Sequence, residues 1–109
     1  KMEVVSGGYQ LRPEIVESAY YLHHYTRDPR WRAMGREFFD DFVRHARTDA
    51  GYAAIRDVRT MERRDAMESF LFAETFKYYW LLFSPPSALD FDGVVFNTEA
   101  HPLRKTWKD

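Results

Sequence analysis

One segment limits the fold of this chain more than any other: residues 65–87, with the sequence "DAMESFLFAETFKYYWLLFSPPS". Its pattern predicts a helix that ends at Pro85 and Pro86. A helix on the surface of a globular domain carries one apolar stripe, whereas this helix is apolar on nearly every side. In a chain of 109 residues with 17% Phe, Tyr and Trp, too little polypeptide remains to enclose so many rings. We therefore expect other protein to cover this segment.

A helix is also predicted within "LRPEIVESAYYLHHYTRDP", residues 11–29. It starts with Pro13 at its first position, where the missing backbone N–H costs nothing, and it stops before the Asp-Pro pair at its end. Three apolar residues at helical spacing define the expected core face: Ile15, Ala19 and Leu22.

The next stretch, "DPRWRAMGREFFDDFVRHARTDAG", predicts a second helix with Pro29 at its first position and a stop near Gly51. One face repeats large apolar residues: Trp31, Met34, Phe38 and Phe42. Because the connection to the first helix is short, we expect the two helices to form an antiparallel hairpin. The following "YAAIRDVRT" predicts a short strand or an extended loop.

Near the end of the chain, "VVFNTEAHPL" (residues 94–103) places polar residues between apolar neighbours. The β-branched and aromatic run followed by Asn97 predicts a strand that enters a turn, and Pro102 is expected to end regular pairing. Thr98 and Glu99 are adjacent hard oxygen donors, which suit a cation such as Ca²⁺ better than a soft metal.

The overall composition excludes several classes of function. A formal net charge of -1 with no basic stripe argues against nucleic acid as a partner. The absence of cysteine rules out disulfides and thiolate metal sites in this chain. No apolar run reaches the roughly 20 residues that span a bilayer. His23 and His24 lack metal-ligand spacing, which favours a packing or surface role.

Four acidic residues allow both a structural and a functional interpretation. Glu14 and Glu17 share one face of the first helix, where they complement the helix dipole or point together into a cleft. Glu68 fits a capping box that begins at Asp65, which is the simpler interpretation. Glu74 lies in so apolar a stretch that its carboxylate should be paired, protonated or facing a polar cavity.

Four stretches, "LRPEIVESAYYL", "GYAAIRDVRT", "MESFLFAETFKYYWLLFS" and "VVFNTEAHPL", together resemble the C-terminal part of glycoside hydrolase family 47, the class I α-1,2-mannosidases, in order and in spacing. This resemblance covers essentially the whole chain. It implies an all-α fold in which residues 1–109 are the C-terminal part of a single (α/α)7 barrel of helical hairpins, with a short β-hairpin plug near the C-terminus. The remaining N-terminal part of that barrel would then cover the apolar helix.

The resemblance also implies a function. Family members remove terminal α-1,2-linked mannose from high-mannose oligosaccharides with inversion, so the implied activity is that of a Ca²⁺-dependent glycoside hydrolase. By resemblance, Glu14 is the general base. Arg12 and Phe70 bind the sugar, with Phe70 as an aromatic floor. Thr98 coordinates Ca²⁺ directly, and three carboxylates act through water: Glu17, Glu74 and Glu99.

Two alternatives are a noncatalytic glycan-binding or quality-control relative, and a helical-hairpin module that binds a protein partner. The general acid of the family would lie upstream of this chain, so the chain alone should be inactive. Many secretory-pathway members carry a cysteine where this sequence has Ala50. The resemblance therefore leaves both a secretory-pathway protein and a bacterial exported or periplasmic one possible.

Overall fold

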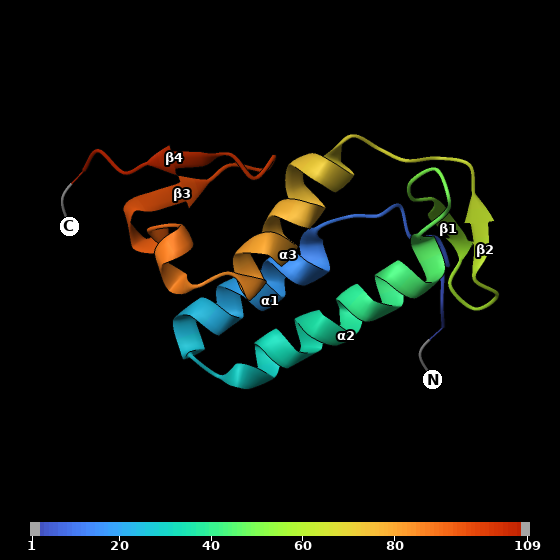
Figure 1. Cartoon of the computed structure of the whole chain (residues 1–109), viewed down its shortest axis with the longest axis horizontal. Coiled ribbons are helices and arrows are strands. Elements are labelled where there is room, and N and C mark those ends of the chain that lie inside the picture. The colour runs from blue at the N-terminus through green and yellow to red at the C-terminus, as the bar shows by residue number, and fades with distance from the viewer. Residues whose placement is uncertain (1–2, 108–109) are drawn as a thin grey trace.

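The computed structural model describes residues 3–107, which form three packed helices with a two-stranded hairpin at each end of the molecule (Figure 1). The principal extents are 49 × 32 × 25 Å. Helices α1 (Glu14–Thr26), α2 (Pro29–Ala46) and α3 (Phe76–Phe83) make up the middle of the molecule. The hairpin of β3 (Val94–Phe96) and β4 (Pro102–Arg104) lies at the opposite end from that of β1 (Ala54–Asp57) and β2 (Glu62–Arg64) (Figure 1). The prediction of a mostly helical chain with a small hairpin near its C-terminus is confirmed.

Helices α1 (Glu14–Thr26) and α2 (Pro29–Ala46) form the expected antiparallel hairpin. Arg27 ends α1 in the left-handed conformation, with φ 56°. Asp28 then caps α2, because its side chain accepts a hydrogen bond from the Arg30 N–H. The predicted start of α2 is confirmed, whereas α1 begins one residue after Pro13.

The core face of α1 differs from the prediction. Ala19 is buried as expected, but Ile15 and Leu22 are exposed. Val16 and Tyr20 pack into the core instead. The helix is apolar on more than one side, so spacing alone could not tell which stripe faces α2 and α3.

The predicted end of α2 near Gly51 is also wrong. The helix stops at Ala46, and Arg47 is extended. The Ala53 N–H donates to the Ala46 carbonyl and the chain turns back toward strand β1 (Ala54–Asp57). Strand β1 pairs with β2 (Glu62–Arg64), so the extended segment that the sequence predicts is confirmed as half of a hairpin.

The apolar helix begins later than predicted. It starts as a π-helical turn, η1 (Leu71–Thr75), and continues as α3 (Phe76–Phe83). Ahead of it, the Ala66 carbonyl accepts from the Ala54 N–H, which keeps that segment extended along β1. The helix therefore has no side-chain cap at its start, and the predicted capping box from Asp65 to Glu68 is wrong.

After α3, two short 3-10 turns, η2 (Pro86–Ala88) and η3 (Phe91–Gly93), lead into the second hairpin. Strand β3 (Val94–Phe96) pairs with β4 (Pro102–Arg104) in antiparallel register. Pro102 begins β4 opposite Phe96 rather than ending the pairing, because a proline at the first position of a strand gives up no obligatory ladder bond.

Two apolar clusters hold these elements together. The larger joins α1 and α3 to the C-terminal segment and includes Val16, Tyr20, Tyr78, Leu82 and Phe91. The smaller joins η1 to α2 and β1 and consists of Leu11, Phe42, Ala46, Ala54 and Leu71. Helices α2 and α3 approach so closely that a Cβ added at Gly35 would overlap Leu82 Cδ2.

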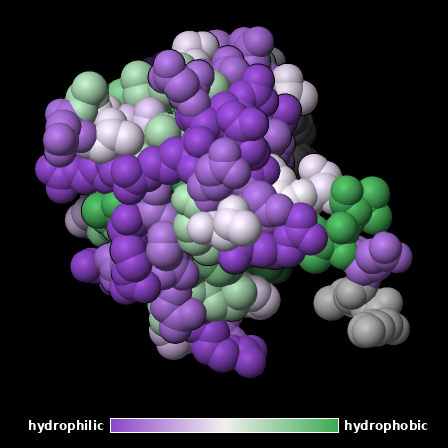
Figure 2. Space-filling model, turned by 90° about the vertical axis from the view of Figure 1, so that its right-hand side faces the viewer, coloured by the Kyte–Doolittle hydropathy of each residue, from purple (hydrophilic) through white to green (hydrophobic). Residues whose placement is uncertain are grey.

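Much apolar surface remains exposed, as the aromatic content predicts. Phe72 and Trp80 are 57% and 59% exposed on the outer side of η1 and α3. The end of the molecule that carries β1 and β2 is different, since its surface is mainly hydrophilic (Figure 2). Exposed apolar side chains are not confined to the helices, however, since Met61 between β1 and β2 is 42% exposed and Leu103 near the C-terminus is 56% exposed.

Candidate functional site

Three chain segments bring the predicted site residues to one end of the helical layer. Residues 12–17 lie at the start of α1, and residues 70–74 form η1 and the position before it. The third segment is the loop between β3 and β4, whose tip adjoins the start of α3 (Figure 1). The predicted residues are thus spread over nearly the whole sequence and meet only in the fold.

The first group consists of Arg12, Glu14 and Phe70. The Arg12 Cζ atom lies 5.5 Å from the centroid of the Phe70 ring, and Arg12 Nη1 is 3.6 Å from Glu14 Oε1. Both charged side chains are largely exposed, so their polar atoms remain available to a ligand. The Tyr9 hydroxyl donates to the Arg12 carbonyl at 3.2 Å, which ties this group to the smaller cluster. Burial and then the Glu14 carboxylate raise the pKa of Tyr9 to about 12, so Tyr9 donates as a neutral phenol.

Glu17 is held by a contact that sequence spacing does not reveal. The Tyr78 hydroxyl donates to Glu17 Oε1 at 3.2 Å. Tyr78 is 1% exposed, and burial together with the Glu17 carboxylate raises its pKa well above the usual range. The phenol therefore stays protonated and keeps donating. Glu14 and Glu17 both line a surface depression of about 580 Å³ beside α1, so they share one face as predicted.

The pKa of Glu74 responds to the other acidic residues of the site. Burial raises the pKa of its carboxyl, and so do the negative charges of three other acidic residues: Glu99, Glu14 and Glu17. The Lys77 ammonium opposes this effect. The structure therefore brings together the four carboxylates that the sequence singled out, at a separation where each acts on Glu74. Glu68 is exposed and takes no part in this group.

Thr98 and Glu99 lie in the turn of the β3–β4 hairpin, and both are exposed. Asn97 shapes this turn, because its side-chain oxygen accepts from the N–H groups of Glu99 and His101 at 3.0 and 2.9 Å. Lys77 Nζ donates to the Ala100 carbonyl at 2.7 Å. That bond ties the turn to the start of α3 and carries Glu99 toward Glu74.

Direct binding of a metal by carboxylates is not supported. Within residues 3–107, no three His, Asp or Glu side chains are placed to ligate one ion together. Carboxylates can also act on a cation through water that they hold around it. Over the same residues, no helix combines the length and the apolarity needed to cross a bilayer.

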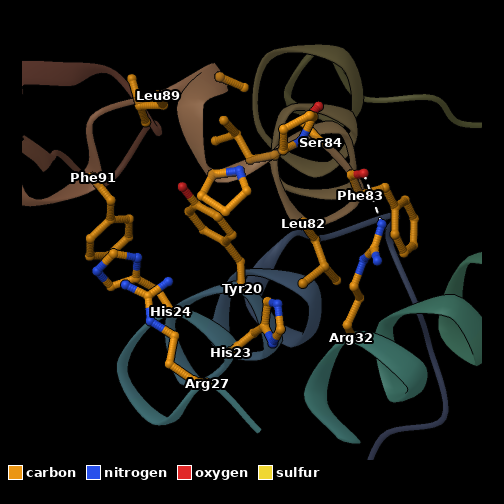
Figure 3. A pocket seen from close by; sticks show the side chains of 14 residues that line it. Tyr20, His23, His24, Arg27, Arg32, Leu82, Phe83, Ser84, Leu89 and Phe91 are labelled. Atoms are coloured by element: carbon orange, nitrogen blue, oxygen red, sulfur yellow. Dashed lines mark hydrogen bonds between the residues drawn. The ribbon is translucent and has the colours of Figure 1, made fainter. Parts of the chain in front are cut away.

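The best-defined cavity of the described chain lies elsewhere. It has a volume of about 270 Å³ and sits at the other end of α1, between His23, Arg32 and the turn after α3 (Figure 3). His24 stacks on Phe91 with ring centroids 4.0 Å apart. These contacts confirm that the histidine pair has a packing role, and none of the predicted site residues lines this cavity.

Two residues of the site were missed from sequence: Tyr78 and Lys77. The only available signal for Lys77 was a lone cation in an apolar helix next to Glu74. Asn97 was predicted to mark the turn, and its side chain accepts from the backbone N–H groups ahead of it, as asparagine often does in turns. Tyr78 gave no signal, because a tyrosine within "KYYW" looks like any core aromatic.

The chain belongs to glycosyl hydrolase family 47, since the model of that family matches residues 1–105. It is 46% identical over 94 residues to mannosyl-oligosaccharide 1,2-alpha-mannosidase MNS1 of Arabidopsis thaliana. The aligned region covers 86% of this chain and 17% of that protein. It is also 46% identical over 95 residues to ER degradation-enhancing alpha-mannosidase-like protein 3 of Xenopus laevis, covering 85% of this chain and 10% of that protein.

Among solved structures, the fold matches an alpha-1,2-mannosidase from Trichoderma reesei with a TM-score of 0.84 and 38% sequence identity. The match covers 93% of this chain and 22% of the mannosidase chain. The chain therefore spans about a fifth or less of the length of these relatives. The predicted family is confirmed.

Proposed function

We propose that this chain is the C-terminal part of an (α/α)7 barrel enzyme that removes terminal α-1,2-linked mannose from high-mannose oligosaccharides. The observation that carries the proposal is the convergence of four carboxylates beside the Arg12–Phe70 pair, in a chain of a glycoside hydrolase family. The names of the similar mannosidases support the substrate class. The exposed apolar side chains of α3 and η1 support a larger barrel that covers them.

In this proposal the reaction proceeds with inversion at the anomeric carbon. An inverting glycosidase needs one carboxylic acid to protonate the leaving oxygen and a base on the opposite face to activate water, with the two groups about 6.5–9.5 Å apart. Glu14 is the proposed base, because its carboxylate is exposed and so can accept a proton from water. The acid would come from the part of the barrel that precedes this chain.

Arg12 and Phe70 are the proposed sugar-binding pair. The guanidinium group lies against the Phe70 ring, and this contact limits the directions in which its N–H donors can point. Glu14 Oε1 is 3.6 Å from Arg12 Nη1, so the residue that orients the sugar also lies beside the proposed base. Substrate and base would thereby be positioned together.

A Ca²⁺ ion is the proposed cofactor, and the residues present fit it. The donors are all oxygens, and burial together with the charges of Glu99, Glu14 and Glu17 raises the pKa of Glu74, so a cation beside it would be favourable. Thr98 would bind the ion directly, and Glu17, Glu74 and Glu99 would hold the water molecules around it. When bound, the ion would neutralise the carboxylates and offer coordination positions to sugar hydroxyls.

The test is mannose release by the complete barrel protein from an α-1,2-linked mannose disaccharide. We expect EDTA to abolish activity, Ca²⁺ to restore it, and Mg²⁺ to restore little, because Mg²⁺ demands a tighter octahedral shell. Full activity in verified metal-free enzyme would refute the calcium assignment. Binding of the disaccharide without mannose release would instead favour a noncatalytic glycan-binding relative.

A further inference from the structure

The side chain of Thr75 links the segment that carries Arg12 and Glu14 to the π-helical turn that carries Glu74. Its side chain is fully buried, with 0% exposure, so its hydroxyl needs a partner within the protein. A threonine in a helix usually turns its hydroxyl back to a carbonyl of the preceding turn. The Thr75 hydroxyl instead donates to the Leu11 carbonyl at 2.6 Å, 64 residues away in sequence.

Leu11 has an unusual backbone. Its φ is 63°, which lies in the left-handed region that residues other than Gly, Asn and Asp rarely adopt. Its side chain is 0% exposed. The residue lies outside α1, so its carbonyl has no place in that helix. Within residues 3–107, the Thr75 hydroxyl is the only hydrogen-bond donor to this carbonyl. Thr75 therefore supplies the partner of a buried acceptor at a residue whose backbone conformation is unfavourable, while the Leu11 side chain packs in the smaller cluster.

The two ends of this hydrogen bond are next to the residues of the proposed chemistry. Leu11 directly precedes Arg12, and the left-handed turn sets the direction in which the chain runs into Glu14 and α1. Thr75 directly follows Glu74 at the end of η1. The two neighbours differ in burial: Thr75 is buried, whereas Glu74 is only partly buried and its carboxyl is affected by the charges of Glu99, Glu14 and Glu17.

We propose that Thr75 is a positioning residue, which locks Leu11 in the left-handed conformation and so fixes Arg12 and Glu14 relative to Phe70 and Glu74. This inference rests on the proposed function. It does not require Thr75 to touch substrate. Its hydroxyl acts through the backbone of Leu11, which the buried bond holds in place.

The test uses the complete barrel protein with three variants. Thr75→Val keeps the shape of the side chain and removes the hydroxyl, whereas Thr75→Ser keeps the hydroxyl. Leu82→Ala is the control, because it opens a cavity in the larger cluster away from this hydrogen bond. We measure kcat and KM on the disaccharide per folded enzyme, together with the melting temperature and amide exchange in residues 9–14.

For Thr75→Val we expect kcat/KM to fall by about 10²-fold, with a lower kcat and a higher KM, because small displacements of positioned groups have effects of this size. Thr75→Ser should recover most of the loss. Leu82→Ala should lower the melting temperature and leave kcat per folded enzyme nearly unchanged. A Thr75→Val enzyme that is less stable but has wild-type kcat and KM would overturn the inference, and so would a Thr75→Ser enzyme as impaired as Thr75→Val.

Amide exchange separates this inference from the proposed function. If the wild-type protein releases no mannose, the proposed function is refuted. Faster amide exchange in residues 9–14 of Thr75→Val, with exchange in α2 unchanged, would still support the role of Thr75 in holding the Leu11 backbone. Unchanged exchange there would overturn it. If Thr75→Val does not fold, Thr75→Cys takes its place in every measurement, since a thiol is of similar size and a much weaker donor.

Discussion

Removing the hydroxyl of Tyr78 tests whether the hydrogen bond from Tyr78 to Glu17 contributes to cation binding. Tyr78→Phe deletes the bond to Glu17 Oε1, along with the polar contact to the Tyr21 hydroxyl, and leaves the ring in its packing with Tyr20 and Phe96. In the proposed function Glu17 holds water around the ion, so its orientation matters even though it does not ligate directly. We expect weaker Ca²⁺ binding with little loss of stability.

The magnitude follows from the geometry. A hydrogen bond to a charged group contributes about 1.5–3 kcal/mol. The 3.2 Å separation is longer than the roughly 2.5–2.7 Å of a strong O–H···O⁻ bond, which places this one at the lower end of that range. Glu17 is half-buried, so water can replace part of what is lost. We therefore expect a loss of about 1.4 kcal/mol at most, equivalent to about a tenfold rise in the Kd for Ca²⁺.

The neighbouring residue supplies a matched control. Tyr79 lies next to Tyr78 on α3 and is 5% exposed, and within residues 3–107 its hydroxyl makes no hydrogen bond. Tyr79→Phe should therefore leave the Kd for Ca²⁺ unchanged. The assay is calorimetric titration of metal-free complete protein with Ca²⁺, with the melting temperature measured in parallel. Equal Kd values for the two variants and wild type would refute the idea that Tyr78 orients Glu17 for the ion.

Three further predictions concern the base, the packing of the helices and the repulsion between the carboxylates. Glu14→Gln should lower kcat by at least about 10² while mannoside binding persists, since that is the usual loss on removing a general base; a near-normal kcat would exclude Glu14 from the mechanism. Gly35→Ala should lower the free energy of unfolding by about 1–2 kcal/mol, because overlap with Leu82 outweighs the gain in helix propensity; an unchanged urea midpoint would show that the contact is easily relieved. Folding raises the pKa of Glu74 above its ordinary 4.5, so the cost in stability is absent below pH 4.5, grows as the pH rises from there, and is complete above the raised value. Glu74→Gln should therefore raise the melting temperature of calcium-free protein at pH 7 and not at pH 4; a lower melting temperature at pH 7 would contradict this.

The sequence by itself determined the helices, the family and the candidate residues. Helix α2 begins at Pro29 because Asp28 and Pro29 act locally, as an N-cap and as a first helical residue. The motif around Thr98 forms a hairpin turn because Asn97 bonds to the backbone just ahead of it. Interactions of this kind span a few residues, so they can be recognised without knowing the rest of the fold.

Only the tertiary structure decided which surfaces meet. The core face of α1 is Val16 and Tyr20 rather than Ile15 and Leu22, because α3 and the C-terminal segment pack on that side. The late start of η1 follows from the bond that ties Ala66 to β1. The contacts of Tyr78 with Glu17 and of Thr75 with Leu11 join residues more than 60 positions apart. Propensity and periodicity describe neighbours along the chain, and such pairings arise only when the whole fold brings distant segments together.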